Sequence, residues 1–142
     1  DSAKSFTVTG TDVNGDAQTE SITGANDGTA TGTSYFLTIS GISAVGNPAG
    51  NVSAGVNASA ADVIFSGRSR LRGVGLTSTG TAGNIDFLNT SPSGTSIMKV
   101  SSVGSATSTR DLKIPDEGVL FTSGIYIQYT VSTFLTLTAF HA

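Results

Sequence analysis

Short segments in which apolar and polar residues alternate run the length of this 142-residue chain. In residues 135–139, for example, Leu, Leu and Ala alternate with two threonines. Such alternation places the apolar side chains on one face of a β-strand, and no segment keeps the 3.6-residue period of an amphipathic helix. About twelve short strands at intervals of roughly 8 to 12 residues are typical of an all-β protein. The sequence therefore predicts an antiparallel β-sandwich, with Greek-key, immunoglobulin-like or jelly-roll-like connections.

The composition narrows the classes of protein to which this chain can belong. Charged residues make up 12% of the chain, the net charge is −3 and the mean hydropathy is +0.13. Disordered chains combine low hydropathy with high net charge, which is the opposite profile. No apolar run approaches the ~20 residues of a membrane-spanning helix, so no membrane partner is predicted. The absence of cysteine argues against a small secreted domain held together by disulfides.

The length predicts one domain or two small ones, because domains average roughly 150 residues. Small residues at 57–61 resemble a linker, and we place a boundary just beyond it, near Ser66. This divides the chain into an N-terminal sandwich module, residues 1–66, and a C-terminal sandwich module, residues 67–142. A single larger sandwich is the alternative that the residues leave open.

The first half begins with an expected hairpin, in which residues 5–9 and 19–23 are the strands. Asn14 and Gly15 lie between them and are the residues that most readily take the positive φ angles of a type I′ turn. Further strands are expected at residues 35–39, 52–56 and 63–65. The second half repeats the pattern, with strands expected at residues 71–77, 84–88, 97–100, 110–114, 119–121, 125–129 and 134–140.

Few residues are suited to catalysis or metal binding. The single histidine, His141, is the penultimate residue, where chain ends usually fray, whereas a catalytic imidazole must be held in place. Asp12, Asn14 and Asp16 have the spacing that opens a calcium loop, but Thr23 stands where the closing carboxylate belongs. An Asx-rich turn is favoured over a weak cation site. No metal, cofactor or enzymatic activity is predicted.

The adjacent carboxylates Asp116 and Glu117 are either a catalytic pair or part of a solvated turn. A glycosidase needs two carboxylates about 5 to 10 Å apart on a common face. Neighbouring residues of a strand point to opposite sides, so a solvated turn between Pro115 and Gly118 is favoured.

Arg68, Arg70 and Arg72 form the most informative charge cluster. On an extended strand they share one face, roughly 7 Å apart. One interpretation is a docking stripe for an acidic surface or for phosphates, since the guanidinium group pairs bidentately with either. The other is a solvated edge strand whose charges prevent sheet-to-sheet aggregation. No nucleic-acid partner is predicted, because the pI is about 4.8 and no aromatic residues flank the arginines.

Four stretches of the chain resemble segments of small β-rich structural proteins of tailed bacteriophages. They are residues 5–24, 33–39, 93–100 and 114–127, which include the sequences SFTVTGTDVNGDAQTESITG and IPDEGVLFTSGIYI. The resemblance implies a β-sandwich module carried on the virion, on the capsid surface or in the tail. It implies no catalytic residue.

These features together predict a capsid decoration or cement protein that stabilises the head lattice. Its partners are expected to be the major capsid protein and copies of itself, as a trimer or a lattice-bridging assembly. The alternative is a tail-fibre or adhesin module that binds host-surface glycans. The residues expected at the partner interface are Arg68, Arg70, Arg72, Phe36, Tyr126, Phe134 and Phe140.

Overall fold

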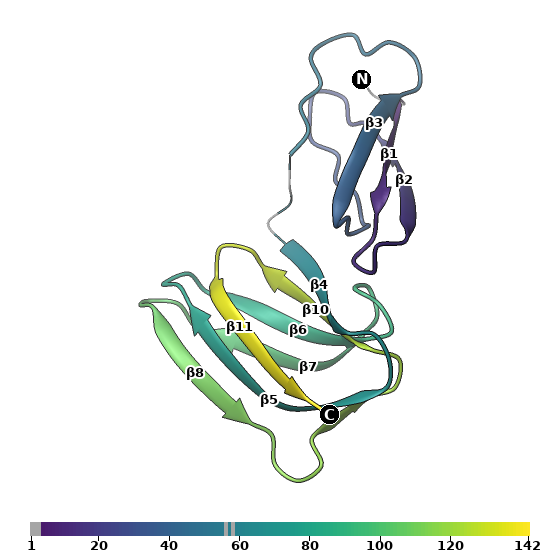
Figure 1. Ribbon diagram of the computed structural model, residues 1–142. Coiled ribbons are helices and arrows are strands. Elements are labelled where there is room, and N and C mark those ends of the chain that lie inside the picture. Colours follow the sequence, from purple (N-terminus) through teal and green to yellow (C-terminus); the bar gives the residue numbers. More distant parts are fainter. Residues whose placement is uncertain (1–3, 56, 58) are drawn as a thin grey trace. The chain divides into compact units, whose positions relative to one another are not determined.

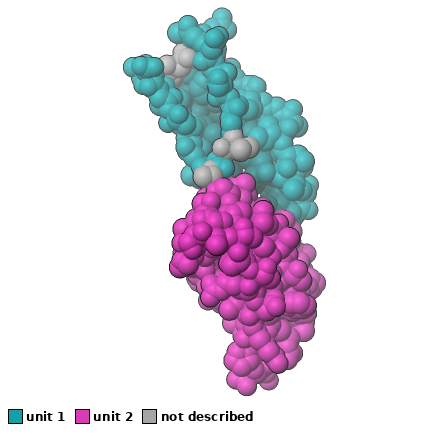
Figure 2. Space-filling model, turned by 90° about the vertical axis from the view of Figure 1, so that its left-hand side faces the viewer, with its two compact units in different colours: residues 1–57 teal, residues 58–142 magenta. Residues whose placement is uncertain are grey.

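The protein is all-β, and its strands pair antiparallel (Figure 1). The structure, a computed structural model, describes residues 4–55, 57 and 59–142. None of these residues lies in a helix, so no described helix is long and apolar enough to cross a membrane. The chain forms two compact units, residues 1–57 and 58–142 (Figure 2).

The N-terminal unit contains one three-stranded sheet in the order β2-β1-β3. Its strands are β1 (Ser5–Thr11), β2 (Ala17–Thr23) and β3 (Thr38–Ala44). Val8 of β1 lies opposite Glu20 of β2 and Ile42 of β3, so these side chains share one face of the sheet. Hydroxyl groups line the other face, where Ser5 bonds Ser21 at 2.7 Å and Thr11 bonds Thr38 at 2.7 Å.

The segment between β2 and β3 packs over the β2 side of the apolar face. Glu20 accepts hydrogen bonds from the N–H and Oγ1 of Thr33, at 2.6 and 3.0 Å, and from the N–H of Ser34. The backbone at Gly32 lies against Glu20 and Ile22. This half of the face is therefore covered, whereas Ile42 on the β3 side is exposed.

The N-terminal module is thus not the sandwich that the sequence predicts, because its described residues supply no second sheet. Residues 45–55 take no strand conformation, although a strand was expected from residue 52; Val56 lies outside the described residues. Gly46, Pro48, Gly50 and Gly55 all fall in this stretch, and glycine and proline both disfavour regular strands.

The C-terminal unit is a β-sandwich. One sheet has the order β4-β10-β6-β7, and the other has the order β11-β5-β8 with β9 also paired to β5 (Figure 1). Every strand predicted from residue 63 onward overlaps a strand of this unit. Its strands are β4 (Ser59–Phe65), β5 (Ser69–Ser78), β6 (Gly83–Asn89), β7 (Thr95–Ser102), β8 (Ser108–Lys113), β9 (Val119–Phe121), β10 (Ile125–Thr130) and β11 (Phe134–His141).

Both sheets of the sandwich contribute to a single hydrophobic core. Phe87 of β6 and Ile125 of β10 come from one sheet, and Leu71 of β5 and Phe121 of β9 come from the other. All four side chains have no exposed surface. The two sheets are therefore held face to face by shared apolar burial, as in other sandwiches.

The two units divide between residues 57 and 58, earlier than the boundary predicted near Ser66. The difference is β4, which pairs with β10 from Ser59 opposite Thr130 to Phe65 opposite Ile125. Local sequence gave residues 57–61 the appearance of a linker, but this pairing makes residues 59–65 an edge strand of the sandwich.

Candidate functional site

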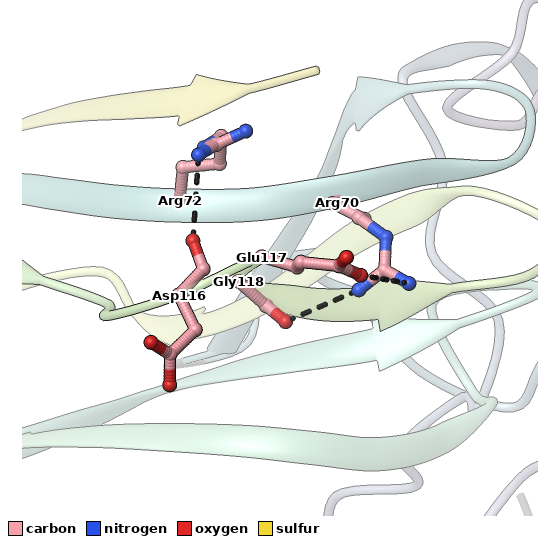
Figure 3. A network of polar contacts seen from close by, with 5 residues as sticks. All are labelled: Arg70, Arg72, Asp116, Glu117 and Gly118. Atoms are coloured by element: carbon pink, nitrogen blue, oxygen red, sulfur yellow. Dashed lines mark hydrogen bonds and ion pairs between the residues drawn. The ribbon is translucent and has the colours of Figure 1, made fainter.

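Two of the three clustered arginines hold the turn between β8 and β9 (Figure 3). Arg70 forms an ion pair with Glu117, with 3.1 Å between Nη2 and Oε2, and its Nη1 donates to the carbonyl of Gly118 at 3.5 Å. Arg72 donates from Nη2 to the carbonyl of Asp116 at 3.4 Å. These two guanidinium groups are thus engaged within the unit, while Arg68 lies exposed in the bend before β5.

Only two of the three arginines of the expected stripe lie on a strand, because Arg68 precedes β5, whereas Arg70 and Arg72 belong to it. In the pairing of β5 with β11, His141 lies opposite Leu71 and Phe140 opposite Gly73, so Arg72 is an extra residue. Such a bulge changes which face the following residues occupy. Leu71 and Val74, three residues apart, both point into the core as a result.

Of the four aromatic residues predicted at an interface, Phe140 is the most exposed. Its side chain is 59% exposed, whereas Tyr126 is only 6% exposed, with its ring against Gly124. Phe134 is half-buried and packs against the sandwich core, and Phe36 is half-buried just before β3. Tyr126 is therefore not available at the surface as predicted, because its position on β10 buries the ring.

Phe140 lies on the outer face of the β11-β5-β8 sheet. Its ring rests on Gly73 of the neighbouring strand, and the Asp111 carboxylate approaches Gly75 in the same way. A side chain at either glycine would contact these groups, so the two glycines allow them to lie close to the sheet. The result is an exposed aromatic ring on the same face as a hydroxyl, that of Thr138, and a carboxylate.

The sandwich is closed along one side and has a cleft along the other. Where β7 and β8 are the edges, Arg110 donates from Nη1 to the carbonyl of Ser101 at 3.1 Å and so joins the two sheets. Between β4 and β11 there is a cleft of about 260 Å³. Its lining includes Ile64, Ile127 and Leu137, with Asp62 as a charged group.

The segment with calcium-loop spacing is an Asx turn. Asp12 Oδ1 accepts hydrogen bonds from the N–H groups of Asn14 and Asp16, at 2.8 and 3.0 Å. Desolvation acts to raise the pKa of Asp12, but these hydrogen bonds outweigh it and leave the pKa below its ordinary value. Gly15 takes a φ of +89°, and Asn14, contrary to a type I′ turn, has no positive φ.

In the described part of the chain, no group of three His, Asp or Glu residues lies close enough together to hold a metal ion. The side chains of Asp116 and Glu117 point in different directions, and Glu117 reaches toward Arg70 (Figure 3). Asp116 takes a φ of 56°, so this pair lies in a turn, as the sequence favoured.

His141 is not part of a frayed end, although chain ends usually fray. The backbones of Arg70 and Ala142 exchange two hydrogen bonds, at 2.8 and 3.0 Å, which fix the end of β11. The imidazole Nδ1 lies 3.3 Å from the hydroxyl of Ser69, and the ring lies 4.9 Å from that of Phe65, measured between centroids. Its side chain remains exposed.

Sequence reasoning missed a group of exposed apolar residues at β3. Leu37, Ile39 and Ile42 are 60%, 56% and 48% exposed. Alternation alone assigns such residues to a core. The sequence did contain a feature that could have indicated this exposed group, since no residue from Gly28 to Ala61 is charged.

Comparison of the chain with protein-family models, with curated proteins and with solved structures found no match.

Proposed function

We propose that this protein is a non-enzymatic virion structural protein of a tailed bacteriophage. Within the virion, its role is that of a capsid decoration or cement protein which stabilises the head lattice. The partners are the major capsid protein and further copies of the chain. The sequence resemblance to virion proteins supports this proposal, and one property of the surface carries it.

That property is the exposure of large apolar side chains in both units. Val103 is 90% exposed in the loop after β7, and Leu37 before β3 and Phe140 on β11 are each about 60% exposed. Single exposed apolar residues are common, but here they occur in a chain with 12% charged residues. Interface cores are depleted in charge and enriched in aromatic residues, so surfaces of this kind suit a protein covered by neighbours in an assembly.

The experiment is to measure copy number and head stability. Purified particles are expected to contain the protein in a fixed, high ratio to the major capsid protein by quantitative mass spectrometry. Heads that lack it are expected to release DNA at lower temperature, and added purified protein is expected to restore their stability. A few copies per particle, or heads equally stable without the protein, would overturn the proposal.

A glycan-binding adhesin is the second candidate, favoured by the outer face that carries Phe140. An exposed aromatic ring provides a surface on which a sugar ring can stack, and Asp111 and Thr138 could bind its hydroxyl groups. Phe140→Ala should then abolish adsorption to host cells while leaving head stability unchanged. The matched control is Leu135→Ala, which removes another exposed apolar side chain of the same strand.

A further inference from the structure

Four of the six outer sheet edges formed by the described residues carry a charged residue. A strand edge offers unpaired backbone N–H and C=O groups to other chains, and charged side chains are a common protection against such pairing. Glu20 lies on β2, Asp62 on β4, Lys99 on β7, and Arg110, Asp111 and Lys113 on β8. The edge strands β3 and β11 have no Asp, Glu, Lys or Arg, and neither has the three-residue β9, which shares its edge of the sheet with β8.

The two uncharged edges differ in what their apolar side chains contact. On β11, Leu137 and Ala139 pack against the sandwich core. On β3, every residue except Gly41 is exposed, including Ile39 and Ile42. No strand pairs with the outer edge of β3 within residues 4–55, 57 and 59–142. β3 is therefore the edge whose backbone and apolar side chains both lack a partner.

In β3 and the residue before it, apolar and hydroxyl residues follow the same order in both directions along the chain. From Leu37 to Ala44 it is LTISGISA, in which apolar and hydroxyl residues are arranged symmetrically about Ser40 and Gly41. A bulge lies at this centre, because Gly41 is opposite Thr9 and Ile39 is opposite Gly10, which leaves Ser40 as an extra residue. The bulge keeps Ile39 and Ile42 on the same face of the sheet, although they are three residues apart.

We propose that the outer edge of β3 pairs antiparallel with β3 of a second copy of this chain, about a two-fold axis at Ser40 and Gly41. In this register Ile39 of each copy lies opposite Ile42 of the other, and Thr38 lies opposite Ser43. Apolar residues meet apolar residues and hydroxyls meet hydroxyls, which are favourable cross-strand pairs. No like charges are brought together, so the edge is complementary to itself.

A second copy is the occupant because this symmetry belongs to self-pairing alone. An unrelated strand would need only an uncharged edge, and the two-way pattern would then have no consequence. A two-fold pair closes at two copies, which distinguishes it from a trimer built around a three-fold axis. The inference concerns the purified protein and does not rest on the proposed function in the virion.

The first test is the mass in solution, measured by light scattering over a dilution series. The wild-type protein is expected at twice 14.2 kDa, and the variant I39K/I42K, which places lysines opposite each other, is expected at 14.2 kDa. I39K/I42E, which places Lys opposite Glu in the proposed register, is expected to restore the dimer. The matched control T19K/T23K adds two lysines to exposed positions of β2, the other edge of the same sheet, and is expected to remain a dimer.

The second test does not depend on the folding of a charged variant. The chain has no cysteine, so Ser40→Cys creates a single thiol beside the proposed axis, at a separation that a disulfide can span. Oxidation is expected to cross-link S40C into a covalent dimer, and T19C on β2 is expected to stay uncross-linked. The proposal is overturned if the wild-type protein has a mass of 14.2 kDa at every concentration, or if T19K/T23K dissociates as much as I39K/I42K. It is also overturned if I39K/I42E fails to recover the dimer or if S40C fails to cross-link.

Discussion

At the scale of single residues, Gly10 determines whether β1 and β3 can pair. A Cβ atom at this position would fall on the carbonyl oxygen of Thr38. We expect Gly10→Ala to lower the free energy of unfolding of the N-terminal unit by about 2 kcal/mol, because the backbone must move to relieve the overlap. Hydrogen exchange should show faster exchange of β1 and β3 amides. Gly50→Ala is the control, since its methyl group meets no atom within 4 Å, and unchanged exchange in Gly10→Ala would contradict the prediction.

Glu20 makes the N-terminal unit sensitive to acid. Desolvation acts to raise the pKa of Glu20, but the hydrogen bonds from Thr33 and Ser34 outweigh it and leave the pKa below 4.5. A group with a lowered pKa in the folded state stabilises the fold above its unfolded pKa, and this stability is lost as the pH falls through the lowered value. Glu20→Gln should therefore lower the free energy of unfolding of the N-terminal unit by about 1 kcal/mol at neutral pH. It should also weaken the dependence of that free energy on pH below 4.5.

The measurement for Glu20 is residue-resolved hydrogen exchange of residues 33–34 at neutral and acidic pH. The control is Glu117→Gln, which removes a carboxylate that is 81% exposed in the other unit. An acid response of residues 33–34 that is the same in wild type and Glu20→Gln would contradict the assignment of the pH dependence to this carboxylate.

At the scale of elements, period-two alternation located most strands but not their partners. Residues 119–121 were predicted as a strand and form β9 with the same bounds. β3 begins at Thr38 instead of residue 35 and extends to Ala44, because pairing with β1 carries the strand through Ser40 and Gly41, which have little intrinsic strand preference. Pairing partners are set by tertiary contacts, so the sequence alone gave neither the bulges nor the missing second sheet of the N-terminal unit.

The same limit applies to the candidate interface. The arginine stripe assumed one strand that contains all three arginines, but β5 begins at Ser69, so Arg68 lies outside it. Tyr126 lies between two isoleucines and Phe140 lies between an alanine and a histidine, yet the first is buried and the second is exposed. Which side of a strand meets another layer depends on the packing of the two sheets, which alternation does not specify.

Phe87 and Phe140 give a direct comparison of a core position with a surface position. Phe87 has no exposed surface at the centre of the sandwich core, so Phe87→Ala should destabilise the C-terminal unit by about 3 to 5 kcal/mol. Phe140→Ala should cost less than about 1 kcal/mol, because its ring is 59% exposed. Denaturant unfolding followed by circular dichroism measures both, and equal losses would show that Phe140 belongs to the core.

At the scale of the whole molecule, the buried apolar residues are distributed unevenly between the two units. The clustered core lies entirely within residues 58–142, from Ile64 to Ala139. In the described part of the N-terminal unit, the buried hydrophobic residues are Val8 and Val13. Since smaller domains bury a smaller fraction of the surface that their unfolded chains expose, the N-terminal unit should be the less stable of the two.

We therefore expect two unfolding transitions, the N-terminal unit first, when residue-resolved hydrogen exchange is followed with increasing denaturant. If β3 pairs with β3 of a second copy, the first transition should also move to higher denaturant as the protein concentration rises, because association stabilises only the folded edge. The second transition should stay constant, and in I39K/I42K both should be independent of concentration. A single transition shared by β1 and β6 would contradict the separate stability of the units, whereas two transitions without concentration dependence would retain it and remove the dimer.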